Sequence, residues 1–576
     1  MWKKRNVQRM KFLIYWHTIR NLKARQIIYR IVFRIKKAMG PGIIGRRISR
    51  LHYASRPAIL NLKNKCFAES AVQNLALRRF KFLNTEAIFS KDIAWNDPAK
   101  SKLWLYNLHY FEYLLPLTRD VSAENFETAK EILAQWLHQN RVGQGPGWEP
   151  YPLSLRILNW IFFYDAYRRY FESDPSFDAH FLQGLYRQTA YLRHFFEYHL
   201  QANHLWVNAK ALLAAGLFFA ERPWIVRGLR CVRQQLKEQI LSDGGHYERS
   251  PMYHALILTD VLDLLNVIRA LHAAAAEIPP EIQSLQNELQ DTAQRMWRYL
   301  QGLTQPDGKL PLFGDTAHGI VPMTDEIGRY LRAIGAAPLS SAAATIFRFV
   351  PSGYYIYRDA DYYLMVDGGE LGVRYQPGHA HCDFLSYEFS FKGQRFIVDS
   401  GVGEYLPTDL RRRARSIYSH NTVVVNGLDQ AELWSAFRMG RHIRPQKVNV
   451  PNEGTLFFEG AYSNTLNRRL AYRHQRLIRL EGGIVVEDRI RGRRIQSVEN
   501  LLHVHPACRI EMARGKILLE RNAVRIALNF DSREMQAEIR DWFYVPEFGK
   551  VLPAKMIVLR PRPGVKEMRY VLGGVK

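Results

Sequence analysis

The chain has 576 residues, 47% of them apolar, and its 81 lysines and arginines against 54 aspartates and glutamates give a formal net charge of +27. This length exceeds what one hydrophobic core usually organises, so two or more domains are expected. The basic excess indicates an anionic partner, which could be nucleic acid, a membrane surface or an acidic polysaccharide. The four scattered cysteines form no CxxC pair and indicate neither a disulfide framework nor a cysteine zinc site.

Residues 1–95 predict a basic, amphipathic helical lead-in. Basic residues interrupt every apolar stretch of "MWKKRNVQRMKFLIYWHTIRNLKARQIIYRIVFRIKKAMG", so we expect neither a signal peptide nor a transmembrane helix. Packing on the next domain is the favoured interpretation, and contact of a basic helix with a membrane surface or an acidic polymer is the alternative. Without a readable leader, a cytoplasmic or inner-membrane-associated location is expected.

Residues 96–340 predict a helical domain. Apolar residues recur with helical periodicity in seven stretches, separated by short runs containing Gly, Pro, Asp or Asn. The stretches are 126–140, 151–171, 181–200, 204–220, 224–241, 251–276 and 281–303. Short loops between so many helices imply antiparallel neighbours, stacked into a bundle, a solenoid or a toroid.

Residues 350–576 predict an antiparallel β-sandwich. Short β-rich runs such as "GYYIYRDADYYLMVDGG", "NTVVVNG" and "RLIRLEGGIVVEDRI" are bounded by Gly, Asn and Asp, as is typical of this architecture. The fold class is therefore α+β and multidomain, with helices first and the sandwich second. Binding sites commonly form where two such domains meet.

The segment "QANHLWVNAK" places Asn203 and His204 where one predicted helix has ended and the next begins. Asn208 follows His204 by one turn. On local sequence alone, Asn203 is best interpreted as a helix N-cap. The alternative is a polar group that contacts a ligand.

The segment "SDGGHYERSPMYHALIL" predicts the start of another helix. Ser250 can cap it, Pro251 suits the first helical position, and Tyr253 then lies in the first turn. The positive end of the helix dipole would favour the phenolate form of Tyr253, and a tyrosine that titrates near ~10 needs such help to act as a base. Taken alone, the segment is better explained by simple packing of Tyr253 and His254.

The segment "GHAHCDFLSYEFSFKGQRFIVDSG" places His379, His381 and Asp383 on alternate positions at the head of a predicted strand, hence on one face. That face continues as an apolar row, so an unpaired imidazole there would cost roughly 1–3 kcal/mol. Asp399 ends one predicted strand and His420 begins another. Two histidines and a carboxylate without cysteine form a donor set that zinc accepts.

These segments, together with "HNTVVVNGLDQAELWSAFRMGR", resemble the heparinase II/III-like polysaccharide lyases. The resemblance runs from about residue 100 to near the C-terminus and is most specific at 203–254 and 372–442. It implies an (α/α) toroid, or incomplete barrel, followed by an antiparallel β-sandwich. Members of the family cleave uronic-acid polymers by β-elimination, in which the C5 proton is removed and the C4 glycosidic oxygen leaves.

The resemblance also implies catalytic roles. Asn203 and His204 would contact and neutralise the uronate carboxylate, which stabilises the carbanion-like intermediate. Tyr253 would donate a proton to the leaving oxygen and could also act as the base. His379 would be a second acid/base or neutralising group.

The resemblance assigns a metal set as well. His381, Asp399 and His420 match the positions that bind a structural zinc in zinc-containing relatives, and Asp383 is expected to give structural support. No organic cofactor is implied. Characterised relatives tend to be exported, so the resemblance favours the periplasm, in conflict with the absence of a readable leader.

Aromatic and arginine side chains near these segments are candidates for contact with the sugar chain. Arginine pairs well with carboxylate or sulfate, and aromatic rings stack on sugars. The predicted substrate-binding residues are Trp148, Tyr151, Arg156, Arg374 and Arg438. Helix packing and structural pairing explain the same residues equally well. The basic run "DLRRRARSIYSH" is expected either to steer an acidic chain or to form a solvated loop.

The leading hypothesis is a carbon–oxygen lyase acting on an acidic polysaccharide. A uronosyl C5-epimerase would remove the same proton and return it to the other face. A glycoside hydrolase would need two carboxylates across the scissile bond, and no such pairing can be read from the sequence. A non-catalytic protein associated with acidic exopolysaccharide belongs to a different class. No nucleic-acid-binding module is recognised, and the oligomeric state is not encoded in any pattern found.

Overall fold

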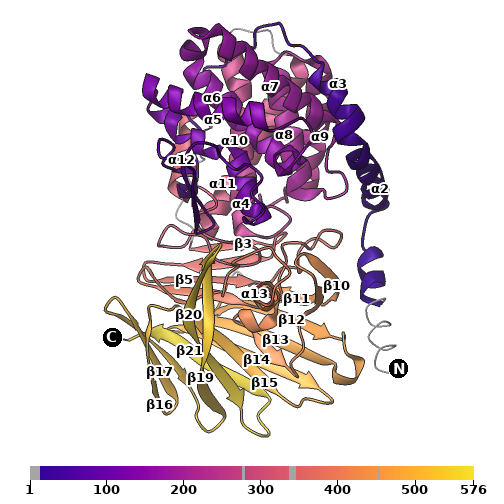
Figure 1. The fold of residues 1–576 in the computed structure, drawn as a ribbon. Helices are drawn as coiled ribbons and strands as arrows, with labels where there is room; N and C mark the ends of the chain where they lie inside the picture. Colours follow the sequence, from indigo (N-terminus) through magenta and orange to yellow (C-terminus); the bar gives the residue numbers. More distant parts are fainter. Residues whose placement is uncertain (1–12, 275–278, 337–344, 452, 576) are drawn as a thin grey trace.

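The computed structural model describes residues 13–274, 279–336, 345–451 and 453–575. A helical domain lies on top of a β-sandwich (Figure 1), which confirms the predicted α+β architecture. No helix within the described ranges is long and apolar enough to cross a membrane.

The N-terminal segment is only partly helical. Its named elements are α2 (Ala24–Met39), α3 (Gly45–Ser49), β1 (Arg79–Phe82) and β2 (Thr85–Ile88). Residues 13–19 are also helical, whereas most of the chain from 50 to 78 is extended. The predicted helical lead-in therefore ends near residue 50. A hairpin follows because Leu83 and Asn84, at φ 54° and 55°, form its two-residue turn.

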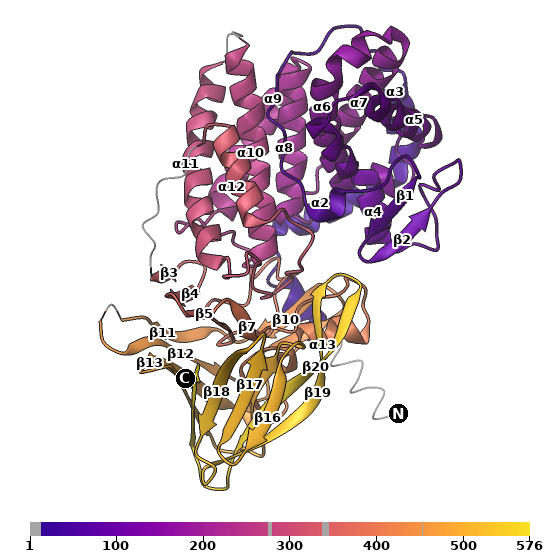
Figure 2. The same cartoon turned by 90° about the vertical axis from the view of Figure 1, so that its left-hand side faces the viewer.

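The helical domain contains the seven predicted stretches as α5 to α11, with α4 and α12 in addition. The helices are α4 (Lys102–Tyr110), α5 (Ala123–Gln139), α6 (Pro150–Glu172), α7 (Pro175–His194), α8 (Ala202–Phe218), α9 (Arg222–Gln239), α10 (Pro251–Ala273), α11 (Pro280–Leu303) and α12 (Thr324–Ala333). Figure 2 shows α8 to α11 side by side, and α8 contacts both α9 and α10, while α10 also contacts α11. α8 and α10 are buried on nearly all sides, which places them at the centre of this domain.

The sandwich consists of two antiparallel sheets. The order in the first is β19 (Met535–Glu547), β20 (Lys550–Pro561), β15 (Val498–Val504), β7 (Gln394–Ile397), β6 (Tyr387–Phe391), β5 (Tyr362–Asp367), β4 (Tyr354–Arg358) and β3 (Ile346–Phe349), with β8 (Val423–Val425) paired to β15. The order in the second is β11 (Pro445–Asn449), β12 (Leu456–Asn464), β13 (Tyr472–Leu480), β14 (Ile484–Gly492), β21 (Glu567–Gly574), β18 (Val524–Phe530), β17 (Lys516–Arg521) and β16 (Arg509–Ala513). The hairpin of β9 (Ala431–Trp434) and β10 (Arg438–His442) and the helix α13 (Asp409–Arg415) lie beside them.

Strands β4 and β5 of the first sheet are covered on both faces, which fixes the junction between the domains. Side chains alternate along a strand, so Tyr354 and Ile356 of β4 join the core of the helical domain. Tyr355, between them, packs in the second core between the sheets. On β5, Met365 packs in the core of the helical domain and Leu364 packs in the core between the sheets. The loops at this edge of the sheet are thereby held against the helix ends that carry the predicted site residues.

Candidate active site

The start of α8 is a strained turn. Gln201 and Ala202 have φ values of 60° and 51°, in the left-handed region that residues other than glycine rarely adopt. Gln201 occupies the N-cap position, so the interpretation of Asn203 as the cap is wrong. The backbone N–H and the side-chain Nδ2 of Asn203 both donate to Glu248 Oε1, at 3.2 and 3.0 Å. Backbone strain of this kind is common at functional sites. Here the two hydrogen bonds from Asn203 to Glu248 hold the turn in this conformation.

The His204 side chain follows Asn203 and is 30% exposed. Its Nδ1 is 3.2 Å from Glu197 Oε2, and its ring centroid is 4.6 Å from that of Tyr151. Burial lowers the pKa of His204, but the nearby Glu197 carboxylate outweighs this effect and raises the pKa above its ordinary value. The imidazolium form is therefore favoured, and it suits contact with an anionic group. Tyr151, a predicted substrate contact, is half-buried beside it.

Tyr253 lies in the first turn of α10, as predicted. Ser250 Oγ accepts a hydrogen bond from the Tyr253 backbone N–H at 3.3 Å and donates to the Asp315 backbone oxygen at 2.8 Å. The Tyr253 hydroxyl is 3.1 Å from that of Tyr405, and its ring centroid is 3.9 Å from that of His379. Burial raises the pKa of Tyr253 well above its ordinary value. The expected phenolate is thus disfavoured, and the resting hydroxyl is available as a proton donor.

His379, His381 and Asp383 lie in the loop before β6, because that strand begins only at Tyr387. The prediction that they share one strand face is therefore wrong. A turn at residues 377–379 and the left-handed backbone of Leu385, at φ 66°, keep the segment out of the sheet. The loop sends the two histidines in different directions, with His379 beside Tyr253 and His381 beside His420.

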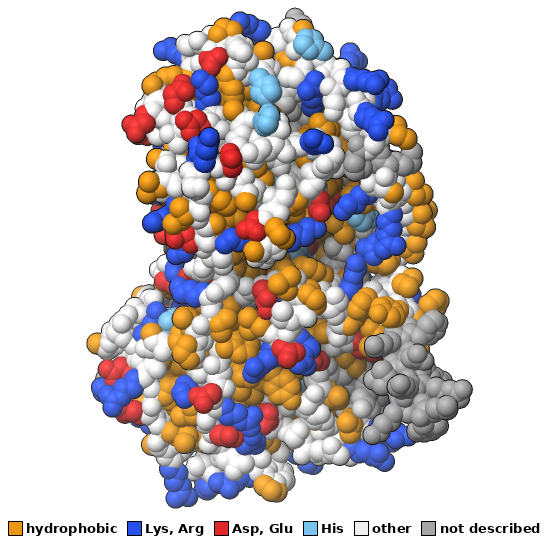
Figure 3. Space-filling view, viewed as in Figure 1, with side chains coloured by type: hydrophobic (Ala, Val, Ile, Leu, Met, Phe, Trp, Pro, Cys, Tyr) orange, Lys and Arg blue, Asp and Glu red, His pale blue; other side chains and the backbone are white. Residues whose placement is uncertain are grey.

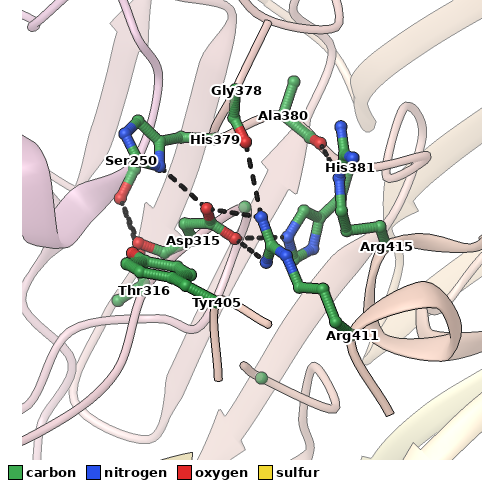
Figure 4. Close-up of polar contacts among 12 residues, drawn as sticks. Ser250, Asp315, Thr316, Gly378, His379, Ala380, His381, Tyr405, Arg411 and Arg415 are labelled. Atoms are coloured by element: carbon green, nitrogen blue, oxygen red, sulfur yellow. Dashed lines mark hydrogen bonds and ion pairs between the residues drawn. The ribbon is translucent and has the colours of Figure 1, made fainter. Parts of the chain in front are cut away.

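Asp315 holds this loop in place (Figure 4). Its Oδ2 accepts from His379 Nδ1 and its Oδ1 from His381 Nε2, both at 2.8 Å. The Arg411 guanidinium of α13 contacts both oxygens, with Nη2 2.8 Å from Oδ2. Burial raises the pKa of Asp315, but Arg411 and the two histidines hold it well below its usual range. Asp315 is therefore a fully buried, ionised carboxylate.

Gly314 allows the loop to approach this carboxylate. Its φ is +55°, and a Cβ at this position would lie 2.9 Å from the His379 backbone oxygen. The Asp315 N–H donates to the same oxygen at 3.0 Å. The Gly314 N–H donates to Asp383 Oδ2 at 3.1 Å. Only glycine fits here without moving the histidine loop.

Glu248 completes the connection between the helices and the loop. One of its oxygens binds Asn203, and the other lies 3.4 Å from His379 Nε2. Glu248 therefore lies between Asn203 and His379, and the Tyr253 ring packs on the other side against His379. His204 and Tyr151 form the more exposed side of the site.

A second cluster of donors lies behind His379. Donor atoms of His381, Asp383 and His420 lie within 4.8 Å of one another, and all three residues are buried. His381 Nδ1 and His420 Nε2 have no hydrogen-bond partner. Asp399, predicted as a ligand, instead accepts a hydrogen bond from His420 Nδ1 at 2.6 Å. In the structure, Asp383 rather than Asp399 lies within reach of both histidines.

Two of the predicted substrate contacts are wrong. Arg156 is fully buried, and its guanidinium donates to the backbone oxygens of His109 and Gly147 and to Gln188 Oε1. Trp148 is 5% exposed and lies in the same core. Both residues stabilise the helical domain because their polar groups are satisfied inside it.

The two arginines of the sandwich that were predicted to contact substrate differ in their exposure. Arg374 is exposed in the loop between β5 and β6. Arg438 is half-buried at the start of β10, and burial next to Arg30 lowers its pKa. The adjacent Phe437 ring lies 6.1 Å from that of His379, which brings Arg438 to the edge of the site. Arg374 has no such connection among the contacts described.

Sequence reasoning missed Glu248, Asp315 and Tyr405 as parts of the site. The partner of each residue is distant in sequence, so no local pattern marks it. Arg411 was expected in a steering or solvated run and is instead 1% exposed. Pairing with Asp315 explains this, because the carboxylate supplies the counter-charge for the buried guanidinium.

We predict that Asp315→Asn strongly destabilises the protein, because it leaves the Arg411 guanidinium buried without its counter-charge. Removing one partner of a buried pair costs about 3–5 kcal/mol. Chemical denaturation followed by fluorescence measures the change. Glu567→Gln, which breaks the exposed pair with Arg489, is the matched control and should have little effect. Equal effects of the two substitutions would contradict the assigned role of Asp315.

Comparisons with known proteins agree with this arrangement. Residues 8–332 match the family described as "Heparinase II/III N-terminus", and residues 342–570 match "Heparinase II/III-like, C-terminal". Curated relatives include the heparin-sulfate lyases of Pedobacter heparinus, 24% identical over 58% of this chain, and of Bacteroides stercoris, 25% identical over 50% of it. The matches span 53% and 45% of those proteins, so the chain aligns with only about half of their length.

Solved structures share the fold across nearly the whole chain. A crystal structure of heparinase III superposes with a TM-score of 0.70 at 16% identity, covering 94% of this chain and 91% of that one. The heparan sulfate lyase of Pedobacter heparinus gives a TM-score of 0.59 at 17% identity, covering 94% and 88%. With both family matches in order and together spanning most of its length, the chain belongs to the heparinase II/III family.

Proposed function

We propose that the protein is a polysaccharide lyase that cleaves a uronic-acid-containing polysaccharide by β-elimination. The observation that carries this proposal is the convergence of Asn203 and His379 on Glu248, with the Tyr253 ring packed against His379. These residues come from two helix starts and one loop, and no local constraint requires them to meet. The names of the curated relatives, heparin-sulfate lyases, support a glycosaminoglycan-like substrate.

The geometry assigns separate tasks to these groups. The uronate carboxylate binds against Asn203 and His204, and the raised pKa of His204 keeps a positive charge available there. This charge lowers the energy of the carbanion-like intermediate formed when the C5 proton leaves. His379, whose Nδ1 is held by Asp315, directs Nε2 toward the centre of the site.

Elimination then breaks the C5–H and C4–O bonds and forms the C4=C5 double bond. A site base takes the C5 proton, and Tyr253 gives its hydroxyl proton to the leaving C4 oxygen. The raised pKa of Tyr253 suits the donor role, and the Tyr405 hydroxyl at 3.1 Å can return a proton to it. The carboxylates at the site are each engaged, Asp315 with Arg411, Glu248 Oε1 with Asn203 and Glu197 with His204. A hydrolase with a free acid–base pair of carboxylates is therefore less well supported.

We predict that the wild-type protein produces unsaturated uronate ends, detected by their ultraviolet absorbance, on at least one polymer among heparan sulfate, hyaluronan and alginate. Tyr253→Phe should lower kcat by about 10²–10⁴-fold, because it removes the proton donor. Tyr357→Phe, which removes a hydroxyl that bonds Asp359 at the surface, is the matched control.

Other outcomes separate the alternatives. Exchange of the C5 proton with solvent, without unsaturated product, would assign the protein as an epimerase. If wild type and Tyr253→Phe bind a polymer with equal affinity and neither reaction occurs, the protein has a non-catalytic exopolysaccharide-binding role.

We also propose that His381, Asp383 and His420 hold a structural zinc. The fit rests on two buried imidazole nitrogens without partners, a neighbouring carboxylate, and Asp399 orienting His420 through its other nitrogen. Zinc accepts such a donor set with a further ligand. The ion would stabilise the loop that carries His379 against the strand that follows His420.

Metal analysis tests this proposal. The purified protein should contain about one zinc per chain, and His420→Ala should lose it. A chelator should lower the melting temperature of the wild type but not of His420→Ala. His442→Asn, on β10 outside the cluster, is the control. Wild-type protein that is free of metal and insensitive to chelator would contradict the site.

We further propose that α2 contacts a membrane surface that carries anionic lipids. The exposed side chains of this helix include Ile27, Ile28, Ile31 and Ile35, which recur at helical spacing on its outer face. In Figure 3, hydrophobic side chains form a column along the right-hand edge, where Figure 1 places α2. Exposed Lys23, Arg34 and Lys37 flank the stripe. Lys23 and Lys37 pair with Glu238 and Glu149. Among the described residues, Arg34 therefore carries the unbalanced positive charge that favours an anionic lipid surface over a neutral one.

Vesicle co-sedimentation tests this contact. The protein should sediment with vesicles containing phosphatidylglycerol and remain in solution with purely phosphatidylcholine vesicles. Ile31→Asp should abolish sedimentation, since it places a charge in the apolar stripe. Ile88→Asp changes a side chain of the same 58% exposure on β2 and should sediment normally. Loss of binding in both variants, or in neither, would contradict the proposal.

A further inference from the structure

Five arginines line a groove at one end of the second sheet. Arg468 and Arg469 lie in the connection from β12 to β13, and Arg491, Arg493 and Arg494 lie at the end of β14 and in the loop beyond it. The pairing of Tyr472 with Gly492 brings these two connections side by side. Together they enclose about 680 Å³. We call this feature the arginine groove.

The arginine groove differs from the surrounding surface in its lack of counter-charge. Arg479 and Arg489 on the same sheet pair with Glu487 and Glu567, at 3.8 and 2.9 Å. No acidic residue lines the groove, and none of its five arginines forms an ion pair within the described residues. Like charges held together without partners repel one another, and a bound polyanion would relieve that repulsion.

The lining selects the class of anion. Besides arginine, the groove presents the hydroxyl group of Thr465 and the backbone of Gly492, whereas the Ser463 hydroxyl already donates to Gln446 Oε1 at 2.8 Å. It has no large exposed apolar side chain, which a membrane contact would need, and its one aromatic residue, Tyr472, is 3% exposed and cannot stack on a base. Guanidinium and hydroxyl donors match carboxylate, sulfate and sugar hydroxyl groups.

The groove is also connected to the candidate active site. Arg441 of β10 donates from Nη2 to the backbone oxygen of Leu466, in the connection that carries Arg468. The same strand begins at Arg438, next to Phe437 at the edge of the His379 site. A chain leaving the site along β10 would therefore reach the groove.

We propose that the arginine groove is a second, non-catalytic binding site for an anionic polysaccharide. The inference rests on the proposed function for its substrate class and extends it with a site that holds the polymer away from the point of cleavage. Long chains would engage both sites at once and bind more tightly than short ones.

Binding without turnover tests the groove. The full chain carrying Tyr253→Phe is titrated against fluorescently labelled heparan sulfate at several salt concentrations, and anisotropy gives Kd. Adding Arg491→Gln, Arg493→Gln and Arg494→Gln should weaken binding by about 10- to 100-fold. Each substitution removes one exposed pair between an arginine and an anionic group of the polysaccharide, and each such pair contributes modestly. It should also reduce the dependence on salt. Adding Arg468→Gln and Arg469→Gln instead is an independent variant that should act in the same direction.

The control carries Arg509→Gln, Arg514→Gln and Arg533→Gln, which remove three exposed arginines elsewhere on the sandwich. If control and groove variants weaken binding equally, net charge explains the effect and the groove is not a site. Groove-dependent binding of duplex DNA or of phosphatidylglycerol vesicles, without such binding of the polysaccharide, would also overturn the proposal. Groove-dependent binding of polysaccharide by a wild type that makes no unsaturated product would reject the lyase and keep the groove.

Discussion

The ion pair between Asp315 and Arg411 is the interaction on which the candidate site depends. Both groups are buried, so each requires the other, and the geometry of the pair fixes what else can approach. The remaining acceptor directions of Asp315 are filled by His379 and His381. One carboxylate thus orients both the imidazole of His379 beside Tyr253 and the imidazole of His381 beside His420. A substitution that displaces His379 or His381 is therefore expected to displace the other histidine through Asp315.

Much of the architecture was predictable because it is encoded locally. Helical periodicity predicted α5 to α11, and the order Ser250, Pro251, Tyr253 predicted the start of α10 to the residue. The resemblance to a known family added the site residues that local patterns alone would have left as packing. Even there, Asn203 was better explained by sequence as a cap, and only the strained turn at Gln201 shows why it is not.

The errors have a common physical origin, which is that contacts between distant residues leave no local pattern. Glu248 meets Asn203 across 45 residues, and Asp315 meets His379 across 64. Arg156 was misassigned for a related reason. An arginine among aromatic residues suits a sugar groove, but it also suits a core in which the guanidinium lies 4.0 Å from the centre of a tryptophan ring, and burial decides between them.

The large positive charge is divided between two tasks. Inside the protein, arginines such as Arg411 are neutralised by carboxylates and help to position neighbouring side chains. At the site, Glu197 offsets much of the positive charge that His204 can carry, so local charge alone attracts an acidic chain weakly. Long-range attraction must therefore come from unpaired surface arginines. Hydrogen bonds within the site then select which bound uronate group reacts. Affinity for the polymer and choice of the bond that is cleaved therefore depend on different residues.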